Sequence, residues 1–282
     1  MFSGLFERPP GLKVVFAEGG IASLAITEPT AGSDATGMKM RFAPQGDDIV
    51  IDGGKIFITS GDVADRLLLF GKWSGIDDAK GAISSLIVEK GTPGLIVGRL
   101  EDKMGHRGAS TAELRFDGAR VPRANLLGAP GEGLKILLAS LNKSRPSVAA
   151  HALGIARAAF EETVGYINQR TQSRRRIVEF QGIQFMLADM ATGIEAARLL
   201  AWQAAWRADQ GLRQTRESAI AKLFATDMCM RATTDAVQIF GGYGYMKDFP
   251  VEKYMRDAKL LQIYEGTNQI QRLVIARHTL GA

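Results

Sequence analysis

The sequence predicts an α+β fold class, in which an antiparallel β-barrel or β-sandwich domain is followed by a C-terminal four-helix bundle. Two observations predict it: short apolar runs separated by turn residues fill the first part, and apolar residues recur every three or four positions after Gly131. The 282 residues, with 46% hydrophobic and 23% charged side chains, suffice for two globular domains. We expect these domains at 21–130 and 131–282, after a short segment at 1–20.

The β-domain prediction rests on short runs of β-branched and apolar residues. Asp48 to Asp52 and Lys55 to Thr59 flank Gly53-Gly54, which predicts a hairpin with its turn at the two glycines. Four further runs at roughly regular spacing predict strands at Leu67–Phe70, Ser84–Glu89, Gly94–Val97 and Ala112–Phe116.

The helical prediction rests on apolar stripes with the period of a helix. Leu134, Leu137, Leu138 and Leu141 form one such stripe, and similar stripes follow. Because proline lacks an amide proton, we expect the first helix to bend near Pro146. The predicted helices cover 131–169, 180–210, 216–240 and 268–279, and short polar loops between them favour a bundle.

Composition and missing motifs exclude several classes of protein. No stretch reaches the ~18 apolar residues of a membrane helix, and the first 13 residues do not read as a signal peptide. The lone Cys229 excludes an internal disulfide and His106, His151 and His278 lie far apart, so we expect no metal site. A Rossmann fingerprint and a P-loop are also absent.

The net charge of +5 and the pI near 9.3 indicate only a mild preference for anions. The basic run Arg174–Arg176 is more typical of a solvated loop or helix end than of a phosphate site. We therefore expect neither a nucleic acid nor a membrane as a partner. The protein is expected in the compartment in which it is made, which is the cytoplasm of a bacterium or, in a eukaryote, the mitochondrial matrix.

A series of short strings, in a fixed order and spacing, resembles the acyl-CoA dehydrogenase family, and within it the medium-chain type. The resemblance extends from about Ala22 to Arg277 and implies a flavin enzyme that lacks the usual N-terminal helical domain, of which 1–20 would be a remnant. The strings are Ala25-Ile-Thr-Glu-Pro29, Ala31-Gly-Ser-Asp34, Phe57-Ile-Thr59, Gly105-His-Arg107, Asn142-Lys-Ser-Arg145, Leu187-Ala-Asp-Met190, Gln238-Ile-Phe-Gly-Gly-Tyr-Gly244, Pro250-Val-Glu-Lys253 and Gln262-Ile-Tyr-Glu-Gly-Thr267.

The resemblance implies that the chain binds FAD through residues of both domains. Phe57 stands where most members carry Trp, and Ser173 and Arg174 stand where an aromatic residue followed by Gly is usual. The positions implied for the flavin half are Ile26, Thr27, Ser33, Phe57, Ile58 and Thr59. Those implied for the ADP half, partly across a subunit contact, are Arg170, Gln172, Gln181, Gln238, Gly241 and Gly242, with Thr267 and Gln269 as further contacts.

The same resemblance implies that Glu265 is the base that removes the α proton of an acyl-CoA thioester. A carboxylate in a dry pocket suits this task, because desolvation raises the proton affinity of a carboxylic acid. A minority branch of the family carries its base where this chain has Ser144, so that alternative is closed. The implied substrate contacts are Ser33, Asn142, which replaces the usual Asp, Arg145, Arg213 and Gly266.

The expected reaction is FAD-dependent α,β-dehydrogenation, with electrons leaving to an electron-transferring flavoprotein and with the chain as a homodimer or homotetramer. A second hypothesis is a truncated, non-catalytic subunit or scaffold of a dehydrogenase assembly. An oxidase shares most of these strings, and a nucleic-acid-binding relative is favoured only by the small basic excess. Acyl chain length is not determined by these residues.

Overall fold

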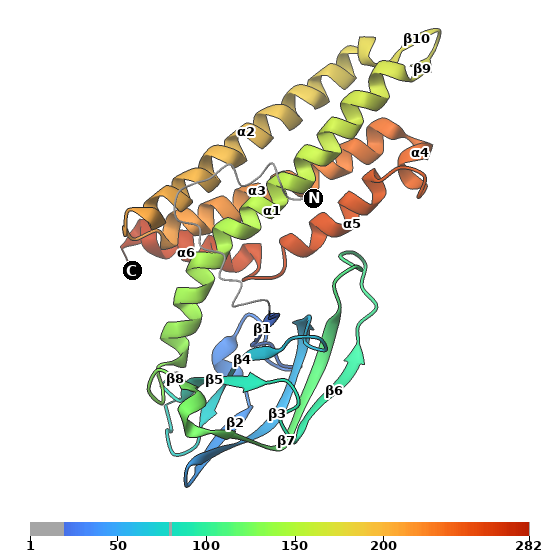
Figure 1. Ribbon diagram of the computed structural model, residues 1–282. Coiled ribbons are helices and arrows are strands. Elements are labelled where there is room, and N and C mark those ends of the chain that lie inside the picture. The colour runs from blue at the N-terminus through green and yellow to red at the C-terminus, as the bar shows by residue number, and fades with distance from the viewer. Residues whose placement is uncertain (1–19, 79–80, 282) are drawn as a thin grey trace. The chain divides into compact units, whose positions relative to one another are not determined.

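The computed structural model describes residues 20–78 and 81–281, and it divides the described chain into two compact units, 20–140 and 141–281. The proposed remnant at 1–20 lies outside the described residues except for Gly20. Figure 1 shows strands in the first unit and helices in the second. The mixed α+β class, with a β domain followed by a helical domain, is confirmed.

The β unit is built on an eight-stranded sheet. Seven strands follow the order β6-β7-β3-β2-β4-β5-β8, and β1 pairs with β4 outside this path. The strands are β1 (Ala22–Ala25), β2 (Arg41–Gln45), β3 (Asp48–Thr59), β4 (Arg66–Trp73), β5 (Ile83–Glu89), β6 (Leu95–Leu100), β7 (Thr111–Pro122) and β8 (Leu126–Leu127). Short 3-10 turns lie at Ala35–Gly37 and Arg123–Asn125.

The sheet is mixed rather than wholly antiparallel. β1 pairs in parallel with the first half of β4, through Ala22 opposite Arg66, and β2 pairs in parallel with its end, through Arg41 opposite Lys72. β1 and β2 therefore pair with successive parts of β4. Parallel pairing requires a long connection between the paired strands, and here the chain passes through β3 before it reaches β4. The remaining strand pairings in this sheet are antiparallel.

The predicted hairpin turn at Gly53-Gly54 is wrong, because β3 runs through both glycines as one strand and pairs with β7 on either side of them. The turn lies earlier, where Gly46 adopts a φ of 61° between β2 and β3. Gly53 instead permits a close approach, since a Cβ there would lie 3.0 Å from the Cα of Met40.

The helical unit contains long helices with bounds close to those predicted. α1 (Gly133–Gln169) begins in the first unit and continues across Pro146. The others are α2 (Gln181–Asp209), α3 (Thr215–Phe240), α4 (Gly242–Tyr245), α5 (Val251–Leu261) and α6 (Asn268–Leu280). Between α1 and α2 lie the short strands β9 (Thr171–Gln172) and β10 (Arg175–Arg176) and a 3-10 turn at Ile177–Glu179. Neither α4 nor α5 was predicted from the sequence.

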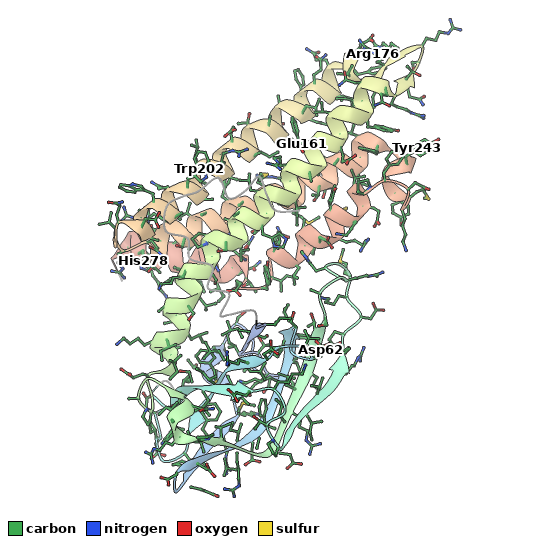
Figure 2. The ribbon with its side chains drawn as sticks, viewed as in Figure 1. Asp62, Glu161, Arg176, Trp202, Tyr243 and His278 are labelled. Atoms are coloured by element: carbon green, nitrogen blue, oxygen red, sulfur yellow. The ribbon has the colours of Figure 1, made fainter. Side chains whose placement is uncertain are left out.

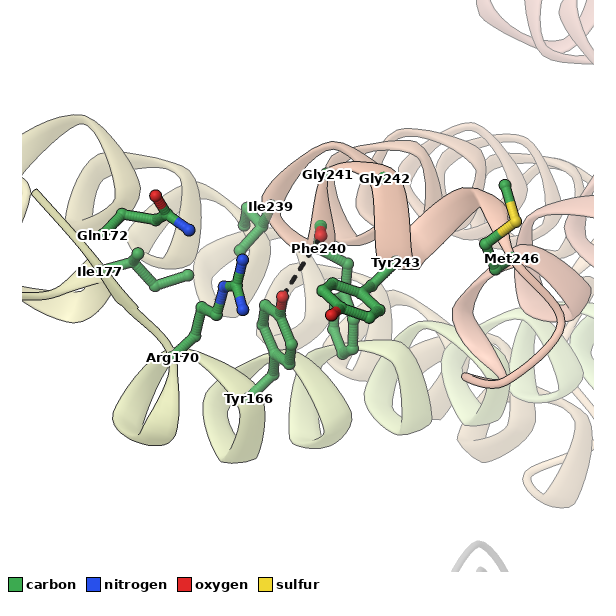
Figure 3. A pocket seen from close by; sticks show the side chains of 10 residues that line it. All are labelled: Tyr166, Arg170, Gln172, Ile177, Ile239, Phe240, Gly241, Gly242, Tyr243 and Met246. Atoms are coloured by element: carbon green, nitrogen blue, oxygen red, sulfur yellow. Dashed lines mark hydrogen bonds between the residues drawn. The ribbon is translucent and has the colours of Figure 1, made fainter.

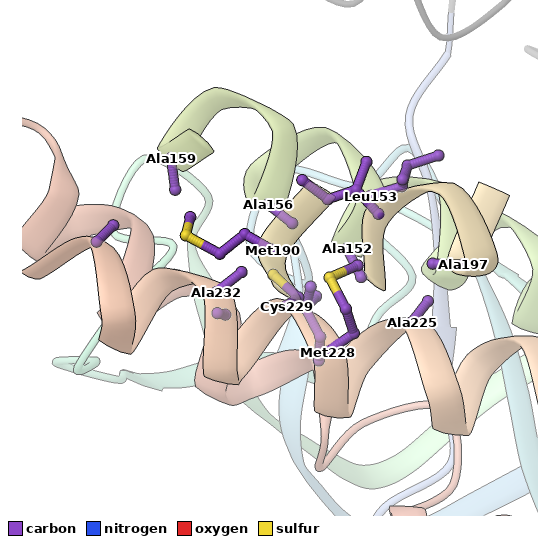
Figure 4. Packing of buried hydrophobic residues seen from close by; sticks show 14 of the residues in the cluster. Ala152, Leu153, Ala156, Ala159, Met190, Ala197, Ala225, Met228, Cys229 and Ala232 are labelled. Atoms are coloured by element: carbon purple, nitrogen blue, oxygen red, sulfur yellow. The ribbon is translucent and has the colours of Figure 1, made fainter. Parts of the chain in front are cut away.

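Small side chains allow the long helices to pack closely in the core of this unit. Ala152, Ala156, Ala225 and Ala232 are buried there, together with larger residues such as Met228 (Figure 4). A Cβ added to Gly193 of α2 would lie 2.8 Å from Met228 Cγ of α3, so the glycine permits this contact. Among the described helices, none is both long enough and apolar enough to cross a membrane.

Candidate active site

Glu265 lies in the tight turn that joins α5 to α6. Its φ is 55° and that of Gly266 is 84°, so two successive residues adopt the left-handed conformation. A Cβ on Gly266 would lie 2.8 Å from Gln271 Nε2, so glycine fits both the conformation and the space. Thr267 ends the turn as the N-cap of α6, where its hydroxyl accepts from the Ile270 amide at 3.3 Å.

A buried lysine and a buried glutamine hold this turn. Lys222 Nζ of α3 donates to the Gly266 carbonyl at 2.9 Å and to Asn268 Oδ1 at 2.8 Å. Gln271 Nε2 donates to the same Gly266 carbonyl at 2.8 Å. The pKa of Lys222 is lowered to about 8, mainly by burial and also by the charge of nearby Arg145, while Asp227 and Glu265 oppose the shift.

The Glu265 side chain is half-buried and directed to α1. Ser144 Oγ donates to Glu265 Oε2 at 2.5 Å, whereas Oε1 has no hydrogen-bond partner within the described chain. Burial lowers the pKa of Arg145, and the negative charge of Glu265 opposes that shift. Burial and the same charge raise the pKa of Tyr264, whose hydroxyl lies 3.3 Å from His151 Nδ1.

Of the substrate contacts implied by the sequence, Asn142 and Arg145 lie together on α1, whereas Arg213 and Ser33 lie on other segments. Arg145, on α1, donates from Nη1 to Asn142 Oδ1 at 3.1 Å, and Asn142 Nδ2 donates to Thr215 at the start of α3 at 3.2 Å. Asn142 and Arg145 thus lie next to Ser144, the residue bonded to Glu265. Arg213 is exposed in the α2–α3 loop, 3.1 Å from His278 of α6, and Ser33 is exposed in the β unit.

A pocket of about 560 Å³ opens where the end of α1 meets the junction of α3 and α4 (Figure 3). It brings together four predicted residues, Arg170, Gln172, Gly241 and Gly242. Added Cβ atoms on either glycine would have no neighbour within 4 Å, so their backbone faces open space. Gln181, Gln238, Thr267 and Gln269 are outside the lining.

Aromatic residues that the sequence analysis did not single out line the same pocket. Tyr166 and Phe240 stack with ring centres 4.0 Å apart, and the Arg170 guanidinium lies 5.2 Å from the Tyr243 ring centre. Ile177, Ile239 and Met246 complete the lining. Tyr243 was visible in sequence as the residue inside the Gly241–Gly244 string, but the α1 residue Tyr166 carried no such signal.

In the β unit the segment at Ile26 and Thr27 lies beside the end of β3, which carries Phe57, Ile58 and Thr59. The Ile56 amide donates to the Thr27 carbonyl at 2.9 Å, and Ser23 Oγ donates to the Thr59 carbonyl at 2.5 Å. A bulge separates Lys55 from Ile58 in the pairing with β7, and Phe57 lies in it with a φ of 59° and 59% of its surface exposed.

Lys55 braces this edge from the inside. Its fully buried Nζ donates to the Ile26 carbonyl at 2.7 Å and to Glu28 Oε1 at 2.8 Å. Burial lowers the pKa of Lys55 to about 8, and the Glu28 carboxylate opposes the shift. Ile58 is buried in the β core, so only its backbone is available to a ligand.

Comparison with known proteins extends over both units. The chain matches the family models for the acyl-CoA dehydrogenase middle domain at residues 23–119 and C-terminal domain at residues 131–280. It is 50% identical over 261 residues to an acyl-CoA dehydrogenase of Bacillus subtilis, which covers 93% of this chain and 69% of that relative.

Two solved structures are similar to this chain over both units. The butyryl-CoA dehydrogenase of Megasphaera elsdenii superposes with a TM-score of 0.91 at 44% identity, covering 93% of this chain and 68% of that one. A chain from a structure described as the electron transferring flavoprotein of Acidaminococcus fermentans also gives 0.91, at 48% identity, covering 93% and 69%. With both domain models matched and half of its 261 aligned residues identical to those of a curated dehydrogenase, the chain belongs to the acyl-CoA dehydrogenase family, oxidoreductases that act on acyl-CoA.

Proposed function

We propose that the chain catalyses FAD-dependent α,β-dehydrogenation of an acyl-CoA thioester, with Glu265 as the base that removes the α proton. The observation that carries this proposal is the state of the Glu265 carboxylate. One oxygen is held by Ser144 and the other has no hydrogen-bond partner in the described residues. A carboxylate with one free oxygen, fixed on a rigid turn, is suited to accept a proton from carbon.

The same turn supplies donors for the thioester carbonyl. Neither the Glu265 amide nor the Gly266 amide donates to another residue in the described part of the chain. An amide directed at the carbonyl oxygen stabilises the negative charge that develops as the α proton leaves. Gln271 Nε2 donates to the Glu265 carbonyl at 3.3 Å, which belongs to the same peptide unit as the Gly266 amide, and Lys222 holds the next peptide through the Gly266 carbonyl.

The residues present fit FAD in both units. When bound, FAD supplies the acceptor for the hydride that leaves the β carbon. In the helical unit, Arg170 and the open backbone of Gly241 and Gly242 suit a pyrophosphate, because guanidinium donors neutralise its charge and glycines allow close approach. In the β unit, the exposed Phe57 ring and the neighbouring Thr27 and Thr59 suit the flavin ring.

Partners follow from the same proposal. We propose an electron-transferring flavoprotein as the electron acceptor, supported by the similarity to a chain in such a structure. We also propose a homo-oligomer, a dimer or tetramer, because α2 exposes the large apolar residues Phe185, Leu199, Trp202 and Trp206, of which Trp202 is labelled in Figure 2. The bacterial relatives reported above are consistent with a bacterial cytoplasm as the compartment.

An anaerobic titration tests the function directly. The FAD-loaded chain is mixed with acyl-CoAs of increasing chain length, beginning with butyryl-CoA, and the absorbance of oxidised flavin is followed. We expect the absorbance to bleach with at least one of them. A protein that binds FAD but keeps its colour with every acyl-CoA would instead support the non-catalytic subunit, and a protein that binds no FAD would refute the proposal.

A further inference from the structure

We propose that Ser144 is a positioning residue for the base, whose hydroxyl holds Glu265 Oε2 and thereby leaves Oε1 as the oxygen that takes the proton. The inference rests on the proposed role of Glu265. Its starting point is the contact between Ser144 Oγ and Glu265 Oε2 at 2.5 Å, between residues 121 positions apart in the chain. That distance is at the short end for a hydroxyl that donates to a charged carboxylate.

The Ser144 hydroxyl has a single proton and two acceptors within reach. The Leu141 carbonyl lies 3.2 Å away, one turn earlier in α1, and the carboxylate lies at 2.5 Å. The shorter distance and the negative charge both favour donation to Glu265. Ser144 therefore constrains the carboxylate as long as Glu265 is ionised, which is the state in which it acts as a base.

The contact persists once the proton has been taken up. A Glu265 protonated on Oε1 keeps Oε2 as a carbonyl oxygen, which still accepts from the Ser144 hydroxyl, although more weakly than a charged oxygen does. The Leu141 carbonyl then competes more evenly for the same hydroxyl proton. One hydroxyl thus stays in contact with the base before and after proton transfer, without movement of either backbone.

The charged neighbours of Glu265 in the helical unit do not perform this task. Arg145 and Lys222 interact with Glu265 through their charge, but Arg145 donates to Asn142 and Lys222 donates to the Gly266 carbonyl and to Asn268. Their fields act on both carboxylate oxygens. Only the directed bond from Ser144 distinguishes Oε2 from Oε1 among the described contacts of this side chain.

The test compares Ser144→Thr with Ser144→Val in the FAD-loaded full chain, because these side chains have nearly the same shape and only threonine has the hydroxyl. We expect the rate of flavin reduction at saturating butyryl-CoA to fall by about threefold to thirtyfold in Ser144→Val, well short of the ~10²- to 10⁴-fold loss for removing a base. Ser144→Thr should stay within about threefold of wild type, as should Ser147→Ala, which changes an exposed serine of α1.

A second measurement needs no turnover. Infrared difference spectra between each protein and its Glu265→Gln counterpart isolate the carboxylate stretches of Glu265. A bond to one oxygen only widens the separation of the antisymmetric and symmetric stretches, so this separation should narrow in Ser144→Val and be kept in Ser144→Thr. Equal spectra and equal reduction rates for the Thr and Val variants would overturn the inference. If Glu265→Gln itself reduces flavin normally, the proposed function fails instead.

Discussion

Replacing Lys222 by Met tests whether the buried ammonium holds the catalytic turn. The change removes two hydrogen bonds from a charged donor, each worth about 1.5–3 kcal/mol. Neither acceptor is left alone, because Gln271 still donates to the Gly266 carbonyl and Thr226 still contacts Asn268 Oδ1. The variant also no longer buries an ammonium group. We therefore expect the free energy of unfolding at pH 7 to fall by about 1–3 kcal/mol.

The lowered pKa of Lys222 also predicts how the stability difference between wild type and Lys222→Met changes with pH. Burial lowers the pKa of folded Lys222 from 10.5 to about 8, so between these values the unfolded chain binds more protons than the folded chain. The free energy of unfolding contributed by Lys222 therefore rises as the pH increases from 8 to 10.5 and is lost as the pH falls through 8. The stability difference between wild type and Lys222→Met should widen over that window, by at most about 3 kcal/mol.

Urea unfolding at pH 7 and at pH 10, followed by circular dichroism, measures both effects. Lys143→Met is the matched control, because Lys143 is exposed on α1 and should change stability by no more than about 0.5 kcal/mol. A Lys222→Met protein as stable as wild type at pH 7 would show that the lysine does not anchor the turn. A difference that stays constant from pH 7 to pH 10 would contradict the lowered pKa.

Three further substitutions test other parts of the account. Arg170→Ala should weaken FAD binding by about 10- to 100-fold in fluorescence titrations, since it removes a charged donor from the pocket, whereas Arg175→Ala, outside the pocket lining, should leave the affinity unchanged. Arg174→Gly should raise the unfolding free energy by up to about 1 kcal/mol, because Arg174 has a φ of 65°; the Ala variant, which keeps the Cβ, should show no such gain. Lys55→Met should destabilise the β unit, since Glu28 would lose its buried cation, and an unchanged melting temperature would contradict this.

The period of the apolar residues predicted the bounds of the long helices well, because each of them buries a long apolar stripe. The first three helices lie within two residues of their predicted bounds, because alternating buried and exposed faces are imposed by the core itself. α5 escaped notice although Val251, Ala258 and Leu261 are buried at helical spacing. Its eleven residues begin directly after Pro250 and carry many charges, so the short apolar stripe gave a weak signal.

The β unit shows why local turn chemistry can mislead. Asp52-Gly53-Gly54 has the composition of a hairpin turn, but β7 pairs with the chain on both sides of it and keeps β3 continuous. Tertiary packing against Met40 decides the role of Gly53. No pattern within a single segment reports such a contact, and the parallel pairing of β4 with β1 and β2 escaped prediction for the same reason.

The sequence named candidate site residues but gave no information on the contacts between them. The resemblance pointed to Glu265, Arg170 and the Gly241-Gly242 pair, and the structure places the last two in one pocket. The bond from Ser144 to Glu265 joins α1 to the turn before α6. Such a pairing depends on how the helices pack, and the sequence alone contains no measure of that distance.

Glu265→Gln tests most directly whether Glu265 removes the α proton, because the amide keeps the shape of the side chain and removes the basic oxygen. Wild type, Glu265→Gln and the control Glu195→Gln, which alters an exposed ion pair with Arg198, are loaded with FAD and mixed anaerobically with butyryl-CoA in a stopped-flow instrument. We expect FAD content and acyl-CoA binding to survive in all three. Flavin reduction should slow by about 10²- to 10⁴-fold in Glu265→Gln alone. Bleaching of Glu265→Gln at close to the wild-type rate would show that Glu265 is not the base.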